Sequence, residues 1–391
     1  AGSCSALIGV LFALQQHDLK RLLAYHSIEN VGIILIGLGL SLLLANAGHP
    51  ALAALGLMAG LYHTLNHALF KGLLFMGAGA VLHATGTRDM ESLGGLIHRM
   101  PITAVCFLVA CLSISALPPF NGFVSEWLTF QTALQTPQLS DALLTAMVPF
   151  SSAMLALAGA LAAACFVKVF GIVFLGQPRS AHAAKAHEVD RWMRCGMAIP
   201  ALFCLLLGLL PAWLLPVLAA VPADMLHFAP TAEMHAHGWL WLTPMDATRA
   251  SYSAPIALFG MMAVAALVYW RLHPKGASVR RSTLWSCGHP HIHARMQYNA
   301  TSFSQPLRRI FAGVLHPDEQ VHPERPAHKL LTRRVRHAVH VADPAVRHLY
   351  QPLGRAILNV SAKVKQVHQH GIHAWLAWTF ATILLLLVLI G

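Results

Sequence analysis

The sequence predicts an all-α protein, a polytopic membrane helix bundle of about nine apolar helices, one of them broken by prolines. Of the 391 residues, 56% are hydrophobic and 11% are charged, whereas a soluble globular domain carries roughly 25% charged residues. Apolar stretches of the length that crosses a bilayer, about 20 residues, recur along the chain. No stretch shows the ten-residue alternation of a membrane β-barrel. The composition therefore excludes an ordinary soluble enzyme.

The expected helices follow one another from the start of the chain to its end. They are predicted at about 1–15, 27–45, 52–83, 101–117, 122–136, 146–175, 196–220, 254–272 and 372–391. The run 52–83 is longer than one perpendicular crossing needs. We therefore expect it to be tilted, broken or partly outside the membrane.

Nearly all of the net charge lies in one segment near the end of the chain. Residues 271–371 hold 16 of the 27 Lys and Arg residues and 4 of the 15 Asp and Glu residues, which accounts for the formal charge of +12. Basic loops stay in the cytoplasm, so this segment is predicted to be cytoplasmic. Counting crossings backwards from it places Lys20 and Arg21 outside, against the same rule. Either the count is off by one, or these charges serve something other than topology.

The beginning of the chain and its cysteines point to a membrane protein that continues upstream. The chain opens Ala-Gly-Ser-Cys inside an apolar stretch, without an initiating Met or the basic start of a signal peptide, so we expect a fragment. The cysteines form no CxxC pair, and most lie in or beside apolar helices, which favours packing over disulfides or metal binding. The seven are Cys4, Cys106, Cys111, Cys165, Cys195, Cys204 and Cys287.

Three titratable residues recur on one face of the segment 52–83. His63, His67 and Lys71 are spaced i, i+4 and i+8, which stacks them over about 12 Å of a helix. A neutral imidazole accepts a proton on one nitrogen and releases it from the other, and a buried Lys can exchange a proton reversibly. The spacing favours a proton relay. The alternatives are hydrogen bonds to neighbouring helices with Lys71 extending to the interface, or a zinc site that would need a third ligand.

A proline pair predicts a broken helix beside a carboxylate. Pro118 and Pro119, followed by Gly122, must interrupt the helix because proline lacks an amide donor. Transporters place broken helices around ion sites. Glu126, one turn past the break, is therefore a candidate proton-binding group, and the alternative is a carboxylate at the mouth of a loop.

Further charges lie in apolar surroundings, where ionisable groups are functional candidates. Asp18 and Lys20 precede a helix, Glu29 lies at the start of 27–45, and Lys168 lies near the end of 146–175. Lys20 and Glu29 are one conceivable ion pair. Lys168 is expected either to extend to the interface or to line a channel.

The sequence lacks the motifs of redox and nucleotide chemistry. It has no Walker loop, no GxGxxG after a strand, no CxxCH and no iron–sulfur spacing. The stretch CGHPHIH at 287–293 superficially resembles a metal-binding tract. We therefore expect no cofactor and no metal in this chain.

Taken in order, the motifs carry a family resemblance. DLKRLLAY at 18–25, HTLNHALFK at 63–71 and LPPFNGFVSE at 117–126 resemble the antiporter-like, proton-translocating subunits of respiratory complex I and its relatives. Within that superfamily, SIENVG at 27–32, FVKVFG at 166–171, RMQY at 295–298 and TSF at 301–303 resemble the branch of hydrogenase 4 component B and the formate hydrogenlyase membrane subunit.

The resemblance implies roles for individual residues. Lys20 and Lys71 match lysines of the family's central hydrophilic axis, His63 and His67 match its bridging histidines, and Glu126 matches the terminal charged residue, where other members have Lys. The family's other half-channel, with a Glu and a Lys on upstream helices, has no counterpart here. This absence supports the expectation of a fragment.

The resemblance also implies a helix on the cytoplasmic membrane face between the last two spanning helices. Residues 326–370 occupy that place. Apolar and basic positions there fit an amphipathic helix, and Asp343-Pro344 predicts two pieces. The apolar face comprises Leu330, Leu331, Val335, Ala338 and Val339, and the basic positions are Arg333, Arg334 and Arg336.

Four parts are predicted on this basis. They are the C-terminal half of the proton-translocating core (1–175), two further transmembrane helices (176–272), a basic cytoplasmic or interfacial segment (273–371) and a terminal transmembrane helix (372–391).

Three functions remain open at the level of sequence. The first is a proton-translocating subunit of a group 4 nickel–iron hydrogenase or formate hydrogenlyase in the bacterial inner (plasma) membrane. Its partners would be protons, membrane lipid, other membrane subunits and peripheral hydrogenase subunits of the same complex, and no nucleic acid. The nickel–iron and iron–sulfur centres would lie in those partner subunits. The second is a subunit of a multi-subunit sodium/proton antiporter, and the third is a non-pumping membrane anchor for a hydrogenase.

Overall fold

A computed structural model gives the structure of the protein, and it confirms the predicted all-α membrane fold. It describes residues 1–137, 139, 141–228, 240–243, 251–273, 282, 285, 287–289, 292–324, 334–368 and 371–390. The chain divides into two compact units, Ala1–Phe311 and Ala312–Gly391. The first unit thus includes the beginning of the predicted basic segment, because residues 297–304 pack on the helix bundle.

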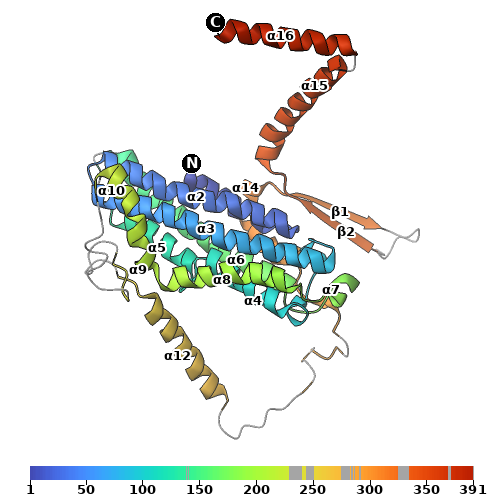
Figure 1. Ribbon diagram of the computed structural model, residues 1–391. Helices are drawn as coiled ribbons and strands as arrows, with labels where there is room; N and C mark the ends of the chain where they lie inside the picture. The colour runs from blue at the N-terminus through green and yellow to red at the C-terminus, as the bar shows by residue number, and fades with distance from the viewer. Residues whose placement is uncertain are drawn as a thin grey trace. The chain divides into compact units, whose positions relative to one another are not determined.

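The first unit is a bundle of helices (Figure 1). Among the described residues of the chain, six helices are long and apolar enough to cross a membrane. The elements of this unit are α1 (Gly2–Gln15), α2 (Leu19–Asn46), α3 (Pro50–Thr85), η1 (Met90–Ser92), η2 (Leu96–His98), α4 (Pro101–Ile114), α5 (Asn121–Leu134), α6 (Ala142–Val173), α7 (Ala181–Lys185), α8 (Arg191–Leu209), α9 (Pro211–Leu218), α10 (Ala220–Leu226), α12 (Ala254–Leu272), η3 (Ala294–Met296) and α13 (Ala300–Ile310).

Local sequence signals set where these helices begin and end. The Asp18 carboxylate accepts a hydrogen bond from the Arg21 amide at 2.9 Å and so caps α2. For this reason α2 begins eight residues before its predicted start. Pro50 opens α3 at a position where its missing N–H costs nothing. Gly86 ends α3 in the left-handed conformation, at φ 69°.

Small residues let α1 and α2 approach each other closely. A Cβ atom added to Gly32 would lie 2.5 Å from the Ala6 nitrogen and 2.6 Å from the Gly2 carbonyl oxygen. A Cβ atom on Gly9 would lie 2.6 Å from the Glu29 nitrogen. Such seams of small residues are the usual way in which membrane helices pack. This seam fixes the part of α2 that carries Glu29.

The broken helix is a single crossing made of α4 and α5. Each has 14 residues, about 21 Å, which is shorter than the hydrocarbon core. The start of α4 lies beside the chain that follows α6, because Glu188 accepts a hydrogen bond from the Ile102 amide at 2.8 Å. At the opposite end α5 reaches the first turns of α6. The two halves succeed each other along the bundle (Figure 1).

The prediction that counted 101–117 and 122–136 as two crossings is therefore wrong. Polar contacts place Lys20 and Arg21 at the end of the bundle that also holds the loop after α3 and the segment 297–304. The Leu19 amide donates to the Arg88 carbonyl at 2.9 Å, and the Thr301 amide donates to Glu91 at 2.8 Å. With the corrected count, the basic residues of α2 no longer oppose the topology rule.

The predicted helix 196–220 is also two helices. It separates into α8 and α9 at Leu210, where Pro211 begins the second helix. Proline cannot donate to the preceding turn, so the first helix ends there.

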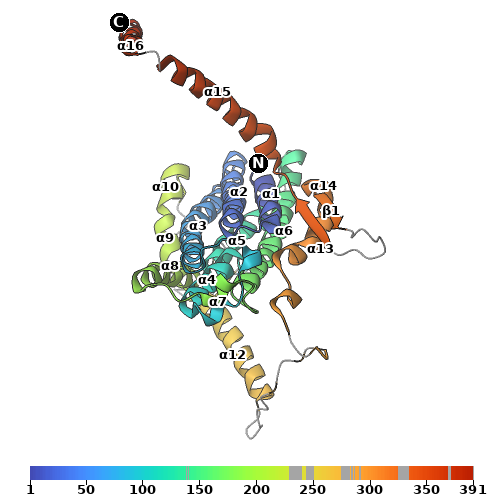
Figure 2. The ribbon, with the colours of Figure 1, turned by 90° about the vertical axis from the view of Figure 1, so that its right-hand side faces the viewer.

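The second half of the broken helix lies inside the bundle. Seen at right angles to Figure 1, α5 lies among α2, α3, α6 and α8 (Figure 2).

The second unit contains α14 (Ala312–Leu315), a two-stranded antiparallel sheet, the π-turn η4 (Val346–Tyr350), α15 (Gln351–His368) and α16 (Ile372–Ile390). Strand β1 (Asp318–Glu324) pairs with β2 (Arg334–His340), with Val339 opposite Glu319.

The prediction of a helix through Val335, Ala338 and Val339 is wrong, because these residues lie in β2. Valines alternate with basic residues there, a period of two that suits a strand. Leu330, Leu331 and Arg333 lie outside the described residues. Helical structure does follow Pro344, where the second piece was predicted.

Replacing Gly32 by Ala should destabilise the bundle by about 1–3 kcal/mol, because the new methyl group would overlap the backbone of α1. The measurement is the thermal unfolding midpoint of the purified protein in detergent. Gly39→Ala is the matched control, since a Cβ atom there meets nothing within 4 Å. Equal midpoints for the two variants would contradict the packing argument.

Candidate functional site

A row of buried polar side chains crosses the interior of the first unit. Four helices that are otherwise apolar contribute to it: α2, α3, α5 and α6. Polar groups at membrane depth are costly unless they satisfy one another. The members of the row are His26, Glu29, Asn30, His63, Asn66, Lys71, Asn121, Ser125, Glu126 and Lys168, each at most 6% exposed.

His63 lies in the middle of this row and joins α3 to two other helices. Its Nδ1 atom lies 2.9 Å from Ser125 Oγ on α5, and its Nε2 atom lies 3.1 Å from Asn30 Oδ1 on α2. Because Asn30 presents its amide oxygen, Nε2 donates, and Nδ1 is left to accept from the serine hydroxyl. Asn66 supports this junction by donating to the Asn121 carbonyl at 2.9 Å.

The row continues along α2 from Asn30 to a buried carboxylate. The Asn30 amide nitrogen lies 3.5 Å from Glu29 Oε2 and donates to the His26 carbonyl at 2.7 Å. His26 Nδ1 is hydrogen-bonded to Glu29 Oε2. His26 and Glu29 are 0% and 1% exposed, so the pair is shielded from water.

Lys71 brings a second charge to Glu29 from α3. Its Nζ atom donates to the Leu23 carbonyl of α2, and it attracts Glu29 electrostatically. Lys71 is 5% exposed. It therefore turns into the bundle instead of extending to an interface.

Of the three residues predicted to stack on α3, His67 is the one outside the row. Its side chain is only partly buried, and its ring packs edge-on against Phe70 at 5.7 Å. Asn66, the residue before it, takes the inward position. The i, i+4, i+8 spacing is real, but of the three side chains only those of His63 and Lys71 reach the row.

Glu126 lies on α5 beside Ser125, at the far end of the row from Lys168. It is 6% exposed, which excludes the alternative of a loop mouth. Its Oε2 atom would lie 3.5 Å from a Cβ atom on Gly159, an ordinary contact distance, so the carboxylate lies against α6. Among the described residues, no hydrogen bond to the Glu126 carboxylate is found.

A cavity of about 400 Å³ lies farther along α5 from Glu126. Its walls come from the end of α5 and the beginning of α6, and they include several hydroxyl groups. The lining residues are Ala133, Leu134, Thr136, Pro137, Thr145, Val148, Pro149 and Ser152. Seven residues, about 10 Å of helix, separate Glu126 from Ala133.

Lys168 ends the row on α6. Its Nζ atom donates to the carbonyls of Leu14 at 2.7 Å and Gln16 at 2.9 Å. The side chain is 1% exposed, so Lys168 does not extend to an interface.

Lys20 and Asp18 lie outside the row, at the beginning of α2. Lys20 is partly exposed, and nine residues of helix, about 13 Å, separate it from Glu29. The predicted pair of Lys20 with Glu29 is therefore wrong, since Glu29 bonds to His26 instead. Asp18 caps α2 and forms an ion pair with Arg88 at 3.1 Å.

Sequence reasoning missed several members of the row, above all His26 and Asn30. A signal was present, because His26, Glu29 and Asn30 are spaced i, i+3 and i+4 and must share a helix face. Ser125 and Asn66 carried no such signal, since uncharged polar residues are ordinary in membrane helices.

The metal alternative gains no support from the described residues, which contain no group of three or more His, Cys, Asp or Glu side chains arranged to hold a metal ion. Part of the tract at 287–293 lies outside them. Cys106, Cys111, Cys165 and Cys204 are buried free thiols.

Known proteins share this arrangement of helices and motifs. Residues 1–154 match the family described as NADH:quinone oxidoreductase/Mrp antiporter, TM. Hydrogenase-4 component B of Escherichia coli strain K12 is 35% identical over 392 residues, covering 100% of this chain and 58% of that protein. Formate hydrogenlyase subunit 3 of the same strain is 38% identical over 326 residues, covering 82% of this chain and 50% of that protein.

A solved structure extends the likeness to nearly the whole fold. A chain of the membrane-bound sulfane sulfur reductase, an archaeal respiratory membrane complex, matches with a TM-score of 0.65 at 26% identity, covering 99% of this chain and 55% of that one. This chain thus spans between half and three-fifths of the relatives that it matches. Residues 1–154 are thus similar to the NADH:quinone oxidoreductase/Mrp antiporter transmembrane family, and the chain along its full length is similar to hydrogenase-4 component B.

Proposed function

We propose that this chain belongs to a proton-translocating membrane subunit of a group 4 nickel–iron hydrogenase or formate hydrogenlyase complex. The observation that carries the proposal is the hydrogen-bonded row from Ser125 through His63 and Asn30 to Glu29 and His26. Titratable and amide groups in contact, enclosed by apolar helices, are what proton movement through a membrane requires.

His63 is the group in this row best placed to pass a proton between helices. It can take up a proton on the Ser125 side and release one on the Asn30 side, because its two nitrogens face different partners. Glu29 and Lys71 lie close enough to attract each other. A proton that arrives at Glu29 weakens its hold on the Lys71 charge, so protonation at one place changes the affinity at the next.

Energy for this movement must come from partner subunits. We propose that the nickel–iron and iron–sulfur centres lie in peripheral subunits of the same complex, since two relatives are named as components of a hydrogenase and a formate hydrogenlyase. Moving one charge against 100 mV costs about 2.3 kcal/mol.

The proposed location is the bacterial inner membrane, with residues 273–371 in the cytoplasm. The corrected crossing count supports this orientation. Lys20 and Arg21 share an end of the bundle with Arg179, whose Nη2 atom donates to the Tyr298 carbonyl at 2.7 Å. These basic residues then all lie on the cytoplasmic side of the membrane, as the positive-inside rule requires.

Replacing Lys71 by Ala in the complete protein should abolish redox-driven proton movement while the complex still assembles. The reason is that Glu29 loses the opposite charge that faces it from α3. The measurement is proton translocation in inverted membrane vesicles during hydrogenase or formate hydrogenlyase turnover. Lys185→Ala is the control, because Lys185 is exposed on α7.

Normal proton translocation by the Lys71 variant would contradict the proton-relay hypothesis and favour the hypothesis of a non-pumping membrane anchor. In that case neutralising Glu126 should also be harmless, and deleting 326–370 should release the peripheral partner from membranes.

Proton translocation should not depend on sodium. Hard cations prefer oxygen ligands, and imidazole and amine nitrogens at His26, His63, Lys71 and Lys168 interrupt the oxygen-bearing members of the row. The check is the translocation rate after all Na⁺ in the buffer is replaced by K⁺. A rate that falls in proportion to sodium would favour the antiporter function instead, which the matched family also includes.

A further inference from the structure

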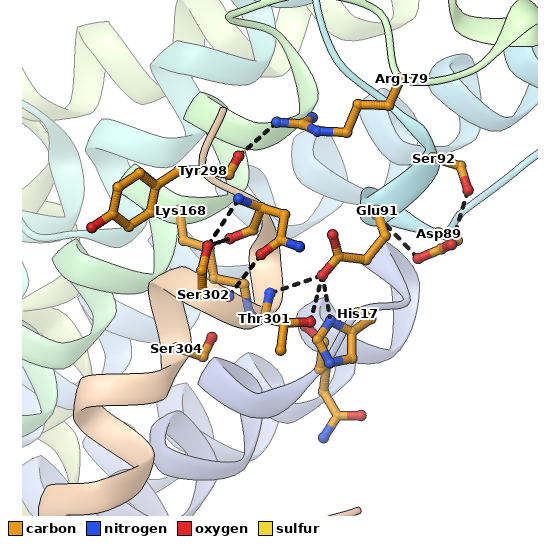
Figure 3. A network of polar contacts seen from close by, with 12 residues as sticks. His17, Asp89, Glu91, Ser92, Lys168, Arg179, Tyr298, Thr301, Ser302 and Ser304 are labelled. Atoms are coloured by element: carbon orange, nitrogen blue, oxygen red, sulfur yellow. Dashed lines mark hydrogen bonds and ion pairs between the residues drawn. The ribbon is translucent and has the colours of Figure 1, made fainter. Parts of the chain in front are cut away.

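Lys168 lies under a cover formed by α13. Ser304 Oγ donates to the Leu14 carbonyl at 2.6 Å, the same carbonyl that accepts from Lys168 Nζ. Figure 3 shows this helix lying across the end of the bundle beside Lys168 and the junction of α1 and α2. Water therefore has no open route to the Lys168 ammonium from directly above it, which agrees with its 1% exposure.

Glu91, in the loop after α3, holds the beginning of α13 against the bundle. Its Oε1 atom accepts hydrogen bonds from the Thr301 amide at 2.8 Å and the Thr301 hydroxyl at 2.6 Å (Figure 3). Farther back, Gln297 donates to the Gln177 carbonyl at 2.9 Å. The segment is thus tied at several points to the loops of the bundle.

His17 lies at the edge of the cover, between water and the buried charges. Its side chain is 41% exposed, and its Nδ1 atom lies 3.6 Å from Glu91 Oε1. That nitrogen is itself buried, and among the described residues no hydrogen bond to it is found. His17 directly follows Gln16, whose carbonyl accepts from Lys168 Nζ at 2.9 Å, so Lys168 is bonded to the peptide unit that leads into His17.

The charges around His17 couple its protonation to that of Lys168. Burial lowers the pKa of His17, and the positive charge of Lys168 lowers it further. Glu91 and Asp89 act in the opposite direction, and Arg308 of α13 acts with Lys168. When Lys168 gives up its proton, a repulsion on the imidazolium disappears. The ring therefore becomes a better proton acceptor at that moment.

On the inner side, neighbouring residues of α6 connect Lys168 to the rest of the buried row. Cys165, one turn earlier on α6, interacts with His26, and the ring of Phe166 lies 4.6 Å from the His26 ring. Lys168 thus acts electrostatically both on His26, another member of the row, and on His17.

We propose that His17 is a proton donor and acceptor that connects Lys168 with water at this end of the bundle, at the edge of the α13 cover. When a proton leaves the bundle, Lys168 Nζ loses one proton and the imidazole gains it, and the ring then releases a proton to water from its exposed side. When a proton enters the bundle, the same transfers run in reverse. The inference rests on the proposed function, because it assigns one opening of the proposed proton path.

His17→Ala in the complete complex should slow redox-driven proton translocation in vesicles roughly a hundredfold, the lower end of what the loss of a positioned proton-transfer group costs. Adding imidazole to the buffer should restore much of the rate, because a small base can occupy the freed space and carry the proton. The control is His98→Ala, an exposed histidine at the same end of the bundle.

Two results would overturn the assignment. One is an unchanged rate for His17→Ala while Lys71→Ala is inactive, which leaves the proposed function standing. The other is a slowed, fully assembled variant that imidazole does not restore, since that points to a structural role. If the Ala variant does not assemble, His17→Gln is judged by the same criteria. Equal translocation by wild type and Lys71→Ala would instead overturn the proposed function itself.

Discussion

A carboxylate buried among membrane helices must be satisfied by its neighbours, and in this protein that carboxylate is Glu29. With 1% of its surface exposed, it cannot rely on water. Its oxygen bonds to His26, its neighbour Asn30 contacts it, and Lys71 faces it from α3. An unpaired charge at this depth would cost several kcal/mol. The positions of α2 and α3 are therefore tied to the satisfaction of one group.

The same requirement shapes the backbone around the row. Gly9 and Gly32 bring α1 against the part of α2 that carries Glu29, and Gly159 of α6 lies beside the carboxyl group of Glu126. The break between α4 and α5 brings the beginning of α5 to the level of His63, where the Ser125 hydroxyl contacts His63 and the Asn121 carbonyl accepts from Asn66. Close packing and polar satisfaction thus support each other, and loosening the first should weaken the second.

Much of the fold could be predicted from the sequence, because apolar length and helix breakers act locally. The helix class, most helix positions and the break at Pro118 follow from such signals. Val335 and Val339 were assigned to a helix by analogy with relatives, although their alternation with basic residues suits the strand that forms. The crossing count failed because length alone does not reveal that two short helices share one crossing. The members of the row were only partly predictable, since His26 and Asn30 gain importance from helices far away in the sequence.

The central claim is that protons follow a continuous hydrogen-bonded row and not a set of isolated charges. Asn30 tests it most directly, because it links His63 to Glu29 without carrying a charge. Redox-driven proton translocation should be measured for Asn30→Leu in the assembled complex, with Asn46→Leu at the exposed end of α2 as the control. The account predicts that the Asn30 variant assembles and loses translocation while the control retains it. Normal translocation by Asn30→Leu would contradict the account.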